Sequence, residues 1–370
     1  MTAASVVIAN YNYARFLPQA IDSALGQTLP GTEVVVVDDG STDESREIVA
    51  AYGDEIRSVL KPNGGHASAL NAGFAASHGE IVCFIDADDM LLPGAMEAAA
   101  GALEPGVAKV HWAMWEVDSD GERTGALMPE DPLCEGDLRE VVAARGPSPR
   151  DHGNPPCSGN AYSRTCLDAI MPVPQRFRRA TDAYLFELAP FFGRIARLPE
   201  PQGLYRVHGV NDFVSMSYRE RLAFAIELHG ALCEEVAATC RRNGIDVDPD
   251  GWREDRWLRQ LASFAEVVDD ALPAGEPFIL ADEGQLPMDA DAQERTIPFP
   301  ERDGVYWGRP VDDAAAVAEL ERLKHRGLRF IVFAWPAFWW LDHYAGLSRH
   351  LNRHGKLTFR DDKAIVFALD

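Results

Sequence analysis

The chain has 370 residues, a length at which a protein usually folds into more than one domain, each with its own hydrophobic core. Its 46% hydrophobic and 25% charged residues are an ordinary globular balance. Its formal net charge of −23, from 35 basic and 58 acidic residues, excludes DNA, RNA and anionic bilayers as partners for most of the surface. The six cysteines include no Cys-x-x-Cys pair, which is typical of a reducing compartment and argues against a disulfide framework or a zinc site.

The first apolar run indicates a strand and not a signal peptide. No basic segment precedes it, and Asn10 and Asn12 interrupt it. The most apolar later stretch, 330–341, is too short to span a bilayer. We therefore expect a cytoplasmic protein with no transmembrane segment, and a peripheral position at the inner membrane face stays open.

The first 105 residues alternate between predicted strands and predicted helices. The strands are expected at 5–9, 33–38, 56–60 and 81–85, and the helices at 15–25, after a Ser41–Glu44 capping box, and at 67–77. Strands at this spacing with helices between them predict an α/β fold with a doubly wound, mostly parallel sheet.

In the rest of the chain the sequence pattern changes twice. A longer strand is expected at 110–117, and apolar stripes then indicate helices up to residue 272. A strand–helix pattern restarts after that point, with a helix expected at 339–353. We predict a domain of residues 1–215 with halves 1–105 and 106–215, a helical segment 216–272, and a small α/β domain 273–370 of unknown role.

One aromatic cluster lies in the predicted C-terminal domain. Trp335, Phe338, Trp339 and Trp340 occupy a strand-to-helix junction. Aromatic faces pack well against pyranose CH groups, so the cluster could bind a sugar. At such a junction the cluster is more often core, and we favour that interpretation.

Two aspartates, Asp86 and Asp88, follow the apolar run 81–85 directly, and Asp89 follows them. Such a run reads as a buried strand of a parallel sheet, and its carboxyl end is where open α/β folds bind ligands. Three carboxylates repel one another unless a cation joins them, and hard oxygen ligands suit Mg²⁺ or Mn²⁺. The alternative is an acidic turn that caps the next helix.

Further polar loops follow the neighbouring predicted strands. Residues 37–41 contain two aspartates and a glycine, and 63–65 reads Asn-Gly-Gly. A parallel sheet brings the carboxyl ends of its strands to one edge, so these loops are expected to meet the Asp86–Asp89 turn at a single crevice.

Residues 5–95 resemble the family 2 glycosyltransferases, which are inverting enzymes of the GT-A fold that use nucleotide-sugar donors. The segments that carry the resemblance are Val6–Asn12, Val36–Asp43, Asn63–Gly73 and Asp86–Asp89. One departure is Leu70, where many members have arginine before the asparagine. A contact with the diphosphate or the base is then missing or supplied from elsewhere.

The resemblance implies a donor and metal site in the first half of the chain. Asp88 would be the main ligand of Mg²⁺ or Mn²⁺, with Asp86 nearer the ribose and the metal-bound waters. The nucleobase would be held by Asp39 together with the loop at Ala9 and Tyr11. Asp39 can accept from the N3–H of uracil or thymine, which favours a UDP- or dTDP-sugar. The turn at Asn63 and Gly64 matches the donor-binding loop of the family.

The resemblance continues less tightly to about residue 215. Ser158 and Asn160 would lie on the acceptor side, and Asp182 would be the catalytic base. Arg206 would bind the donor, and His208 would be a third metal ligand. The alternatives are a helix N-cap role for Asp182, a satisfied loop histidine at His208, and an ion pair between Arg206 and local carboxylates.

The function that follows is an inverting, metal-dependent transfer of a hexose-type sugar from a nucleotide diphosphate to an acceptor hydroxyl, in bacterial surface polysaccharide or glycoconjugate synthesis. The acceptor could be a saccharide, a lipid-linked saccharide or another hydroxyl compound. One alternative is a nucleotidyltransferase, which usually carries a Gly-rich basic motif near its first strand, whereas residues 9–13 contain neither glycine nor lysine. Another is a non-catalytic nucleotide-sugar-binding module.

Overall fold

The computed structural model describes residues 3–129, 132–147, 154–208, 218–253, 256–273, 275–283, 286, 295–302 and 304–369. Within two helices, the side chains of 218–222, 253 and 256–260 are not described. The chain forms two compact units, one of residues 1–211 with 228–254 and the other of 212–227 with 255–370. No helix in the described ranges is both long and apolar enough to cross a membrane.

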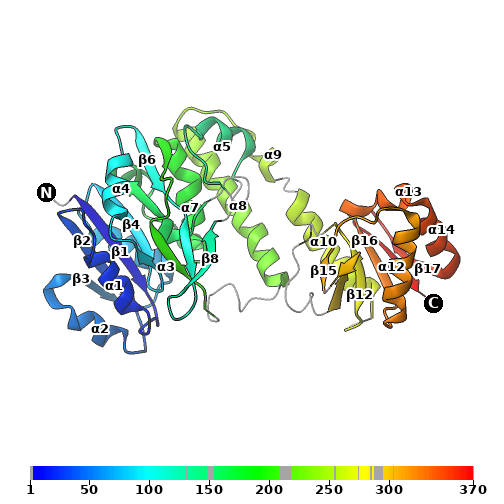
Figure 1. Cartoon of the computed structure of the whole chain (residues 1–370). Helices are drawn as coiled ribbons and strands as arrows, with labels where there is room; N and C mark the ends of the chain where they lie inside the picture. The colour runs from blue at the N-terminus through cyan, green and yellow to red at the C-terminus, as the bar shows by residue number, and fades with distance from the viewer. Residues whose placement is uncertain are drawn as a thin grey trace. The chain divides into compact units, whose positions relative to one another are not determined.

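The first unit contains a seven-stranded sheet (Figure 1). In spatial order its strands are β10 (Arg194–Arg197), β6 (Val107–His111), β9 (Asn160–Ser163), β4 (Ile81–Asp86), β1 (Ala4–Asn10), β2 (Thr32–Asp39) and β3 (Arg57–Lys61). The strands β4, β1, β2 and β3 are parallel, and β9 runs antiparallel to both of its neighbours. The predicted α/β class and mostly parallel sheet are therefore confirmed.

Side chains of the central strands alternate between two hydrophobic clusters, one on each face of the sheet. From β1, Val7 points into one cluster, while Val6 and Ile8 point into the other. The first cluster includes residues of α3 (His66–Ala76), α5 (Arg139–Arg145), α6 (Arg164–Ile170), α7 (Thr181–Leu188), α8 (Tyr218–Arg242) and α9 (Pro249–Arg253). The second includes residues of α1 (Leu17–Leu25), α2 (Ser45–Ala51) and α4 (Ala95–Ala102). Both faces of the sheet are covered, which explains why β1 and β4 are apolar at nearly every position.

A second sheet of the same unit brings a distant segment to the end of β4. Its order is β5 (Met90–Leu91), β11 (Gly203–Arg206), β7 (Met114–Val117) and β8 (Arg123–Met128). Because β11 pairs with β5, which follows β4 by three residues, Arg206 lies beside the acidic turn.

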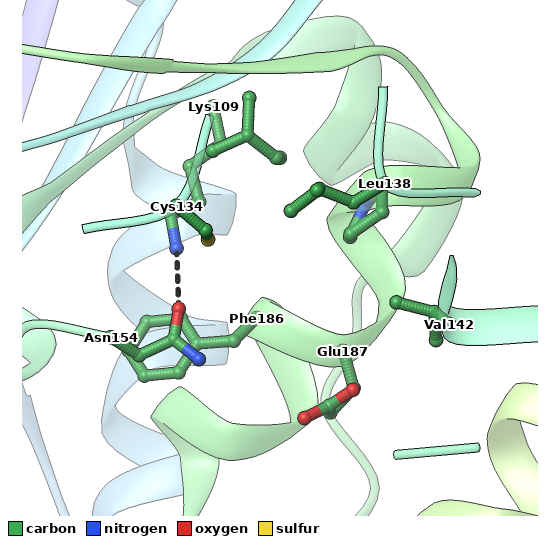
Figure 2. A pocket seen from close by; sticks show the side chains of 9 residues that line it. Lys109, Cys134, Leu138, Val142, Asn154, Phe186 and Glu187 are labelled. Carbon is green, nitrogen blue, oxygen red and sulfur yellow. Dashed lines mark hydrogen bonds between the residues drawn. The ribbon is translucent and has the colours of Figure 1, made fainter. Parts of the chain in front are cut away.

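The core of this unit contains a buried lysine (Figure 2). Lys109 on β6 is 1% exposed, and its Nζ lies 4.2 Å from the centre of the Phe186 ring and 3.4 Å from Asn154 Oδ1. Cys134 and Glu187 line the same cavity of about 10 Å³. Burial lowers the pKa of Lys109 to about 8, although Cys134 and Glu187 oppose the shift.

The second unit has its own five-stranded sheet and its own core. The sheet order is β13 (Thr296–Pro298), β12 (Phe278–Ala281), β16 (Phe330–Ala334), β18 (Ala364–Leu369) and β17 (Gly355–Arg360). One hydrophobic cluster includes residues of α12 (Asp313–His325), α13 (Trp340–His343) and α14 (Ala345–His354), and the other includes residues of α10 (Arg256–Ala271). A separate hairpin pairs β14 (Glu301–Arg302) with β15 (Val305–Tyr306).

Three local predictions need correction. The capping box does not form, because Ser41 Oγ accepts from Asn12 N and α2 begins only at Ser45. The strand predicted at 110–117 is two strands, since the chain leaves the large sheet after β6 and enters the small sheet at β7. The helix predicted at 339–353 is divided into α13 and α14.

The aromatic cluster of the second unit is mainly core. Trp340 is fully buried and donates its Nε1–H to Glu283 Oε1 at 2.6 Å. Trp335 and Phe338 pack against the hydrophobic clusters, and Trp339 is 37% exposed. The interpretation of these residues as packing surface is confirmed for Trp340.

Candidate active site

The polar loops predicted to converge do lie at one edge of the seven-stranded sheet. In the parallel register, Ala9 is opposite both Val37 and Asp86, and Asp39 is opposite Lys61. The carboxyl ends of β1, β2, β3 and β4 are therefore adjacent, as expected for a ligand site in an open α/β sheet.

The two aspartates of the Asp-x-Asp sequence contact different partners. Asp86 Oδ1 lies 3.1 Å from Nε2 of His66, whereas Asp88 Oδ2 lies 2.9 Å from Nε2 of His208. The Asp86 side chain is 36% exposed and that of Asp88 only 12%. The pair is thus divided between two imidazoles, one at the start of α3 and one after β11.

The buried acidic turn is electrostatically costly. Burial raises the pKa of Asp88, and the charge of Asp86 raises it further, while the contact with His208 opposes the shift. Burial also raises the pKa of Asp89 well above its ordinary value, with added repulsion from Asp88 and Asp86. A cation bound to this turn would relieve both the repulsion and the desolvation.

Asp88 and His208 fit a divalent cation. Cis ligands of an octahedral Mg²⁺ or Mn²⁺ lie about 3 Å apart, given metal–ligand bonds of about 2.1 Å, and the two side-chain atoms are 2.9 Å apart. The His208 ring stacks on Phe16 at 5.0 Å and meets the edge of Tyr13 at 5.5 Å, so aromatic packing fixes its direction. An oxygen ligand with one imidazole suits Mn²⁺ and is compatible with Mg²⁺.

A second group of possible ligands surrounds Asp86. Within the described ranges, His66, Asp86 and Cys157 offer ligand atoms that all lie within 4.8 Å of one another. Burial raises the pKa of the Cys157 thiol well above its ordinary value, which favours the neutral form over the thiolate that binds metals. This set is therefore the weaker candidate for a hard cation.

Asp182 lies in the first turn of α7, on the same side of the site as His66 and Asp86. Burial raises the pKa of Asp182, the hydrogen bond from Ala183 N (2.9 Å) opposes the rise, and the charges of His66 and Asp86 act on it with opposite signs. The N-cap position of α7 is Ala180, so Asp182 is not the cap residue. Its carboxyl group is thus held near the other acidic groups by the fold and not by helix capping.

His66 is a site residue to which sequence reasoning gave no role. Burial lowers its pKa, but Asp86, Asp182 and Asp39 raise it, and the rise prevails. These three carboxylates are all predicted site residues. The signal in the sequence is the position of His66 directly after Asn63-Gly64-Gly65, at the first residue of a helix that starts at this edge.

Asp39 holds the glycine loop in place. Its carboxylate accepts from the backbone N–H of Gly64 at 3.1 Å and of Gly65 at 2.7 Å, and it pairs with Lys61 Nζ. Asp39 is 2% exposed, so the carboxylate that was expected to meet a nucleobase is occupied inside the protein. Gly65 has φ of +84°, a conformation that glycine adopts readily.

Arg206 is fully engaged within the protein. Its side chain donates to Asp88 O, Asp118 O, Ser119 O, Gln19 Oε1 and Met90 Sδ, and it lies over the Phe16 ring. These contacts use all five N–H donors of a guanidinium group, and Arg206 is 1% exposed. These contacts position the acidic turn, and donor binding by Arg206 stays a prediction.

Ser158 and Asn160 are also buried, both at 0% exposure. Ser158 Oγ accepts from Asp86 N at 3.0 Å and donates to Asp89 Oδ2 at 2.6 Å. Asn160 Nδ2 donates to the carbonyl oxygens of Pro156 and Cys157. Both residues support the acidic turn and the adjoining segment from within, and their place on the acceptor side stays a prediction.

The exposed members of the predicted set lie in the two neighbouring loops. Tyr11 is 45% exposed and Asn63 is exposed, while Ala9 is 9% exposed at the end of β1. Asn10 Nδ2 donates to both Asp38 Oδ2 and Ser41 Oγ at 3.1 Å, which ties the loop after β1 to the loop after β2. Tyr11 and Asn63 are therefore the predicted residues most open to a ligand.

The family model described as "Glycosyl transferase family 2" matches residues 5–141, which contain the loops after β1, β2, β3 and β4. The chain belongs to glycosyl transferase family 2. An uncharacterized glycosyltransferase of Nostoc sp. is 36% identical over 217 residues, which are 57% of this chain and 66% of that protein. One of Rickettsia prowazekii is 43% identical over 93 residues, 25% of this chain and 29% of its own length.

Among solved structures, the family 2 chain is similar to residues 1–349 of S. aureus TarS in complex with UDP, with a TM-score of 0.48 and 18% sequence identity over 98% of this chain and 95% of that one. The alignments with the Nostoc and Rickettsia proteins leave about a third and more than two thirds of those relatives unmatched.

Proposed function

We propose that this family 2 enzyme transfers a hexose-type sugar from a nucleotide diphosphate to an acceptor hydroxyl with inversion at the anomeric carbon, and that it requires Mg²⁺ or Mn²⁺. The observation that carries the proposal is that one edge of the sheet holds two aspartates in different surroundings, Asp88 and Asp182. Asp88 Oδ2 lies 2.9 Å from His208 Nε2, the separation expected for two ligands of one cation, and the partly buried Asp182 carboxylate accepts a hydrogen bond from Ala183 N.

Inversion requires one in-line displacement. The acceptor oxygen forms a bond to the anomeric carbon while the bond from that carbon to the diphosphate oxygen breaks. The acceptor hydroxyl proton passes to Asp182, whose raised pKa makes its carboxylate a stronger base than that of an ordinary aspartate. Such a base contributes roughly 10²–10⁴ in rate.

Asp88 and His208 would hold the divalent cation, which supplies charge stabilisation to the departing diphosphate. Asp86 faces His66 across 3.1 Å and would orient the donor beside that site. Arg206 and Ser158 keep the turn in place, because both contact its backbone or side chains from within the fold.

The donor would enter over the loops at Tyr11 and Asn63, which are exposed, and over the N–H groups of the glycine loop that Asp39 organises. UDP- and dTDP-sugars are the first donors to test. The buried position of Asp39 removes it as a direct base reader in this conformation, so discrimination between bases falls to the exposed loops. We extend the proposal to bacterial surface polysaccharide or glycoconjugate synthesis, which the bacterial sources of the two relatives support.

The first experiment is a panel of nucleotide sugars tested for thermal stabilisation with Mn²⁺, since a ligand that binds the native state raises Tm. The stabilising donor is then incubated with water as the slow acceptor, and release of nucleoside diphosphate is measured. The proton NMR spectrum of the freed sugar gives its anomeric configuration. Retention of configuration would overturn the inverting mechanism. Conversion of the donor and added pyrophosphate to a nucleoside triphosphate and a sugar phosphate would favour a nucleotidyltransferase.

The base assignment is tested with Asp182→Asn. We expect nucleotide release to fall by roughly 10²-fold or more, with donor stabilisation preserved. The matched control is Asp168→Asn, the same change on an exposed position of α6. Equal rates in Asp182→Asn and wild type would refute the assignment, and donor binding without any turnover in wild type would favour a non-catalytic binding module.

A further inference from the structure

The second unit contains a large cleft that the transfer reaction leaves without a role. Its volume is about 960 Å³, and it lies between the β14–β15 hairpin, the segment after it and the helix α12. That volume is at the upper end of the range of small-molecule sites. The residues that line it include Glu301, Arg302, Trp307, Val311, Arg322 and Arg326.

The cleft presents aromatic and aliphatic surface to solvent. Trp307 is 64% exposed and Val311 is 91% exposed. Trp307 does not pack in the core of the second unit, unlike Trp340, but its backbone is fixed by the hydrogen bond from Trp307 N to Pro300 O at 3.1 Å. Pro310 O accepts from Tyr344 Oη at 2.7 Å, so the wall beside Val311 is attached to the core. An indole held open on a fixed backbone is a surface for stacking.

The cleft is also rich in arginine, in a chain whose net charge is −23. The guanidinium carbon of Arg302 lies 4.3 Å from the centre of the Trp307 ring. Within the described residues, Arg302 makes no ion pair, so its N–H donors stay available beside the indole. Arginine recognises carboxylate and phosphate groups through paired N–H donors.

Two further arginines are fixed along the same cleft. The Glu301 side chain is 7% exposed and accepts from Arg322 at 2.6 Å and from Arg326 at 2.7 Å. Glu319 Oε2 accepts a hydrogen bond from Arg322 Nε at 2.7 Å. The side-chain hydrogen bond from Arg322 and the backbone one from Gly304 lower the pKa of Glu301, which keeps this carboxylate ionised and the arginines in place. Arg322 Nη1 takes part in none of these bonds, so it can face a ligand.

We propose that this cleft binds a saccharide that carries carboxylate or phosphate groups, with Trp307 stacked on a sugar ring and Arg302 paired with the anionic group. The pyranose ring offers CH groups to the indole, and the anion offers acceptors to the guanidinium. A neutral sugar would use only the first contact and inorganic phosphate only the second. The proposal goes beyond the transfer reaction and stands whether or not the first unit transfers a sugar.

The test is calorimetric titration of the full chain with four probes: trigalacturonic acid, pentamannose phosphate, maltotriose and inorganic phosphate. At least one charged saccharide is expected to bind roughly tenfold or more tightly than maltotriose and than phosphate, a difference of about 1.4 kcal/mol. Whichever charged saccharide binds more tightly shows whether the preferred anion is a carboxylate or a phosphate. Equal binding of all four probes, or binding of none, would overturn the proposal.

Variants locate the site. Trp307→Ala is expected to weaken binding of the charged saccharide by roughly tenfold, and Trp307→Phe by much less. Arg302→Gln is expected to weaken that binding several-fold and to leave the affinity for maltotriose unchanged. Arg360→Gln removes the same charge from an exposed position on β17 of the same unit and should change affinity by less than about twofold. Undiminished binding by both Trp307→Ala and Arg302→Gln places the saccharide elsewhere. Circular dichroism and Tm confirm that each variant is folded.

Discussion

At the residue scale, the two aspartates of one short motif have separate surroundings. Asp88 is nearly buried against His208, whereas Asp86 is partly exposed against His66. Residues i and i+2 after a strand end have no fixed relation once the chain turns, and here Asp89 N bonds to Asp86 O at 3.1 Å to close that turn. Because Asp86 and Asp88 have different partners, we predict that they contribute unequally to metal binding.

Asp88→Asn should weaken Mn²⁺ binding by about tenfold or more, because it removes a charged oxygen ligand, while Asp86→Asn should weaken it less. Mn²⁺ affinity is measured by electron paramagnetic resonance titration of each variant without donor. An exposed control, Asp168→Asn, should match wild type. Equal losses in Asp86→Asn and Asp88→Asn would show that both carboxylates bind the ion directly.

The pH dependence of turnover reports on Asp182. Burial raises the pKa of this carboxyl group in the folded protein, and only its ionised form can accept the acceptor proton. Activity should therefore be complete above that raised pKa and be lost as pH falls through it, at higher pH than an ordinary aspartate near 3.9 would give. The measurement is kcat against pH at saturating donor and Mn²⁺, and an acid limit at or below the ordinary aspartate value would contradict it.

At the element scale, β11 and the acidic turn depend on one side chain. Arg206 joins the end of β11 to the turn, to the hairpin between β7 and β8, and to Gln19 on α1. Arg206→Lys retains the charge but offers three donors in place of five. The carbonyl groups of Asp88, Asp118 and Ser119 would lose hydrogen-bond donors.

We expect Arg206→Lys to destabilise the first unit by about 2–4 kcal/mol, the range for a broken buried polar network, and to weaken Mn²⁺ binding, since the turn that carries Asp88 would loosen. Urea unfolding and Mn²⁺ titration measure the two effects. Arg15→Lys is the control, because Arg15 pairs with Asp120 at an exposed site. Unchanged stability in Arg206→Lys would refute the positioning role.

The elements were more predictable than the contacts between them. The strands 5–9 and 81–85 follow from continuous apolar runs, and β1 and β4 fall there. The polar ends of these strands could be assigned to one edge, because parallel strands fix that relation. Sequence could not show that Arg206 meets Gln19, 187 positions away, or that Asp39 faces inward to the glycine loop. Both depend on long-range packing that no local pattern encodes.

At the scale of the whole molecule, each unit has its own hydrophobic clusters and its own sheet. The first contains the family 2 loops, and the second contains the arginine-lined cleft at Trp307. Acidic groups dominate the chain overall, yet arginines line the cleft of the second unit, where the proposed saccharide is anionic. The −23 charge therefore restricts polyanions in general and leaves local sites for small anions.

Because Lys109 is buried, we expect the stability of the first unit to vary with pH in the alkaline range. Its pKa is about 8 in the folded protein, because burial disfavours the charged amine, against about 10.4 in an unfolded chain. Between these values the unfolded state binds more protons, so this group's contribution to stability rises as pH increases from about 8 to 10.4. Below about pH 8 the full cost remains, on the order of 3 kcal/mol.

Lys109→Met retains a long side chain in the cavity and removes the charge. We expect this variant to have a higher Tm than wild type at pH 7, and the difference between the two should shrink as pH rises toward 10. Subtracting the variant's pH profile cancels the titration of tyrosines and other lysines that both proteins share. Lys356→Met, at an exposed position of β17, is the control and should follow wild type. A Lys109→Met protein that is less stable at pH 7 would show instead that the Phe186 and Asn154 contacts outweigh the cost of burying the amine.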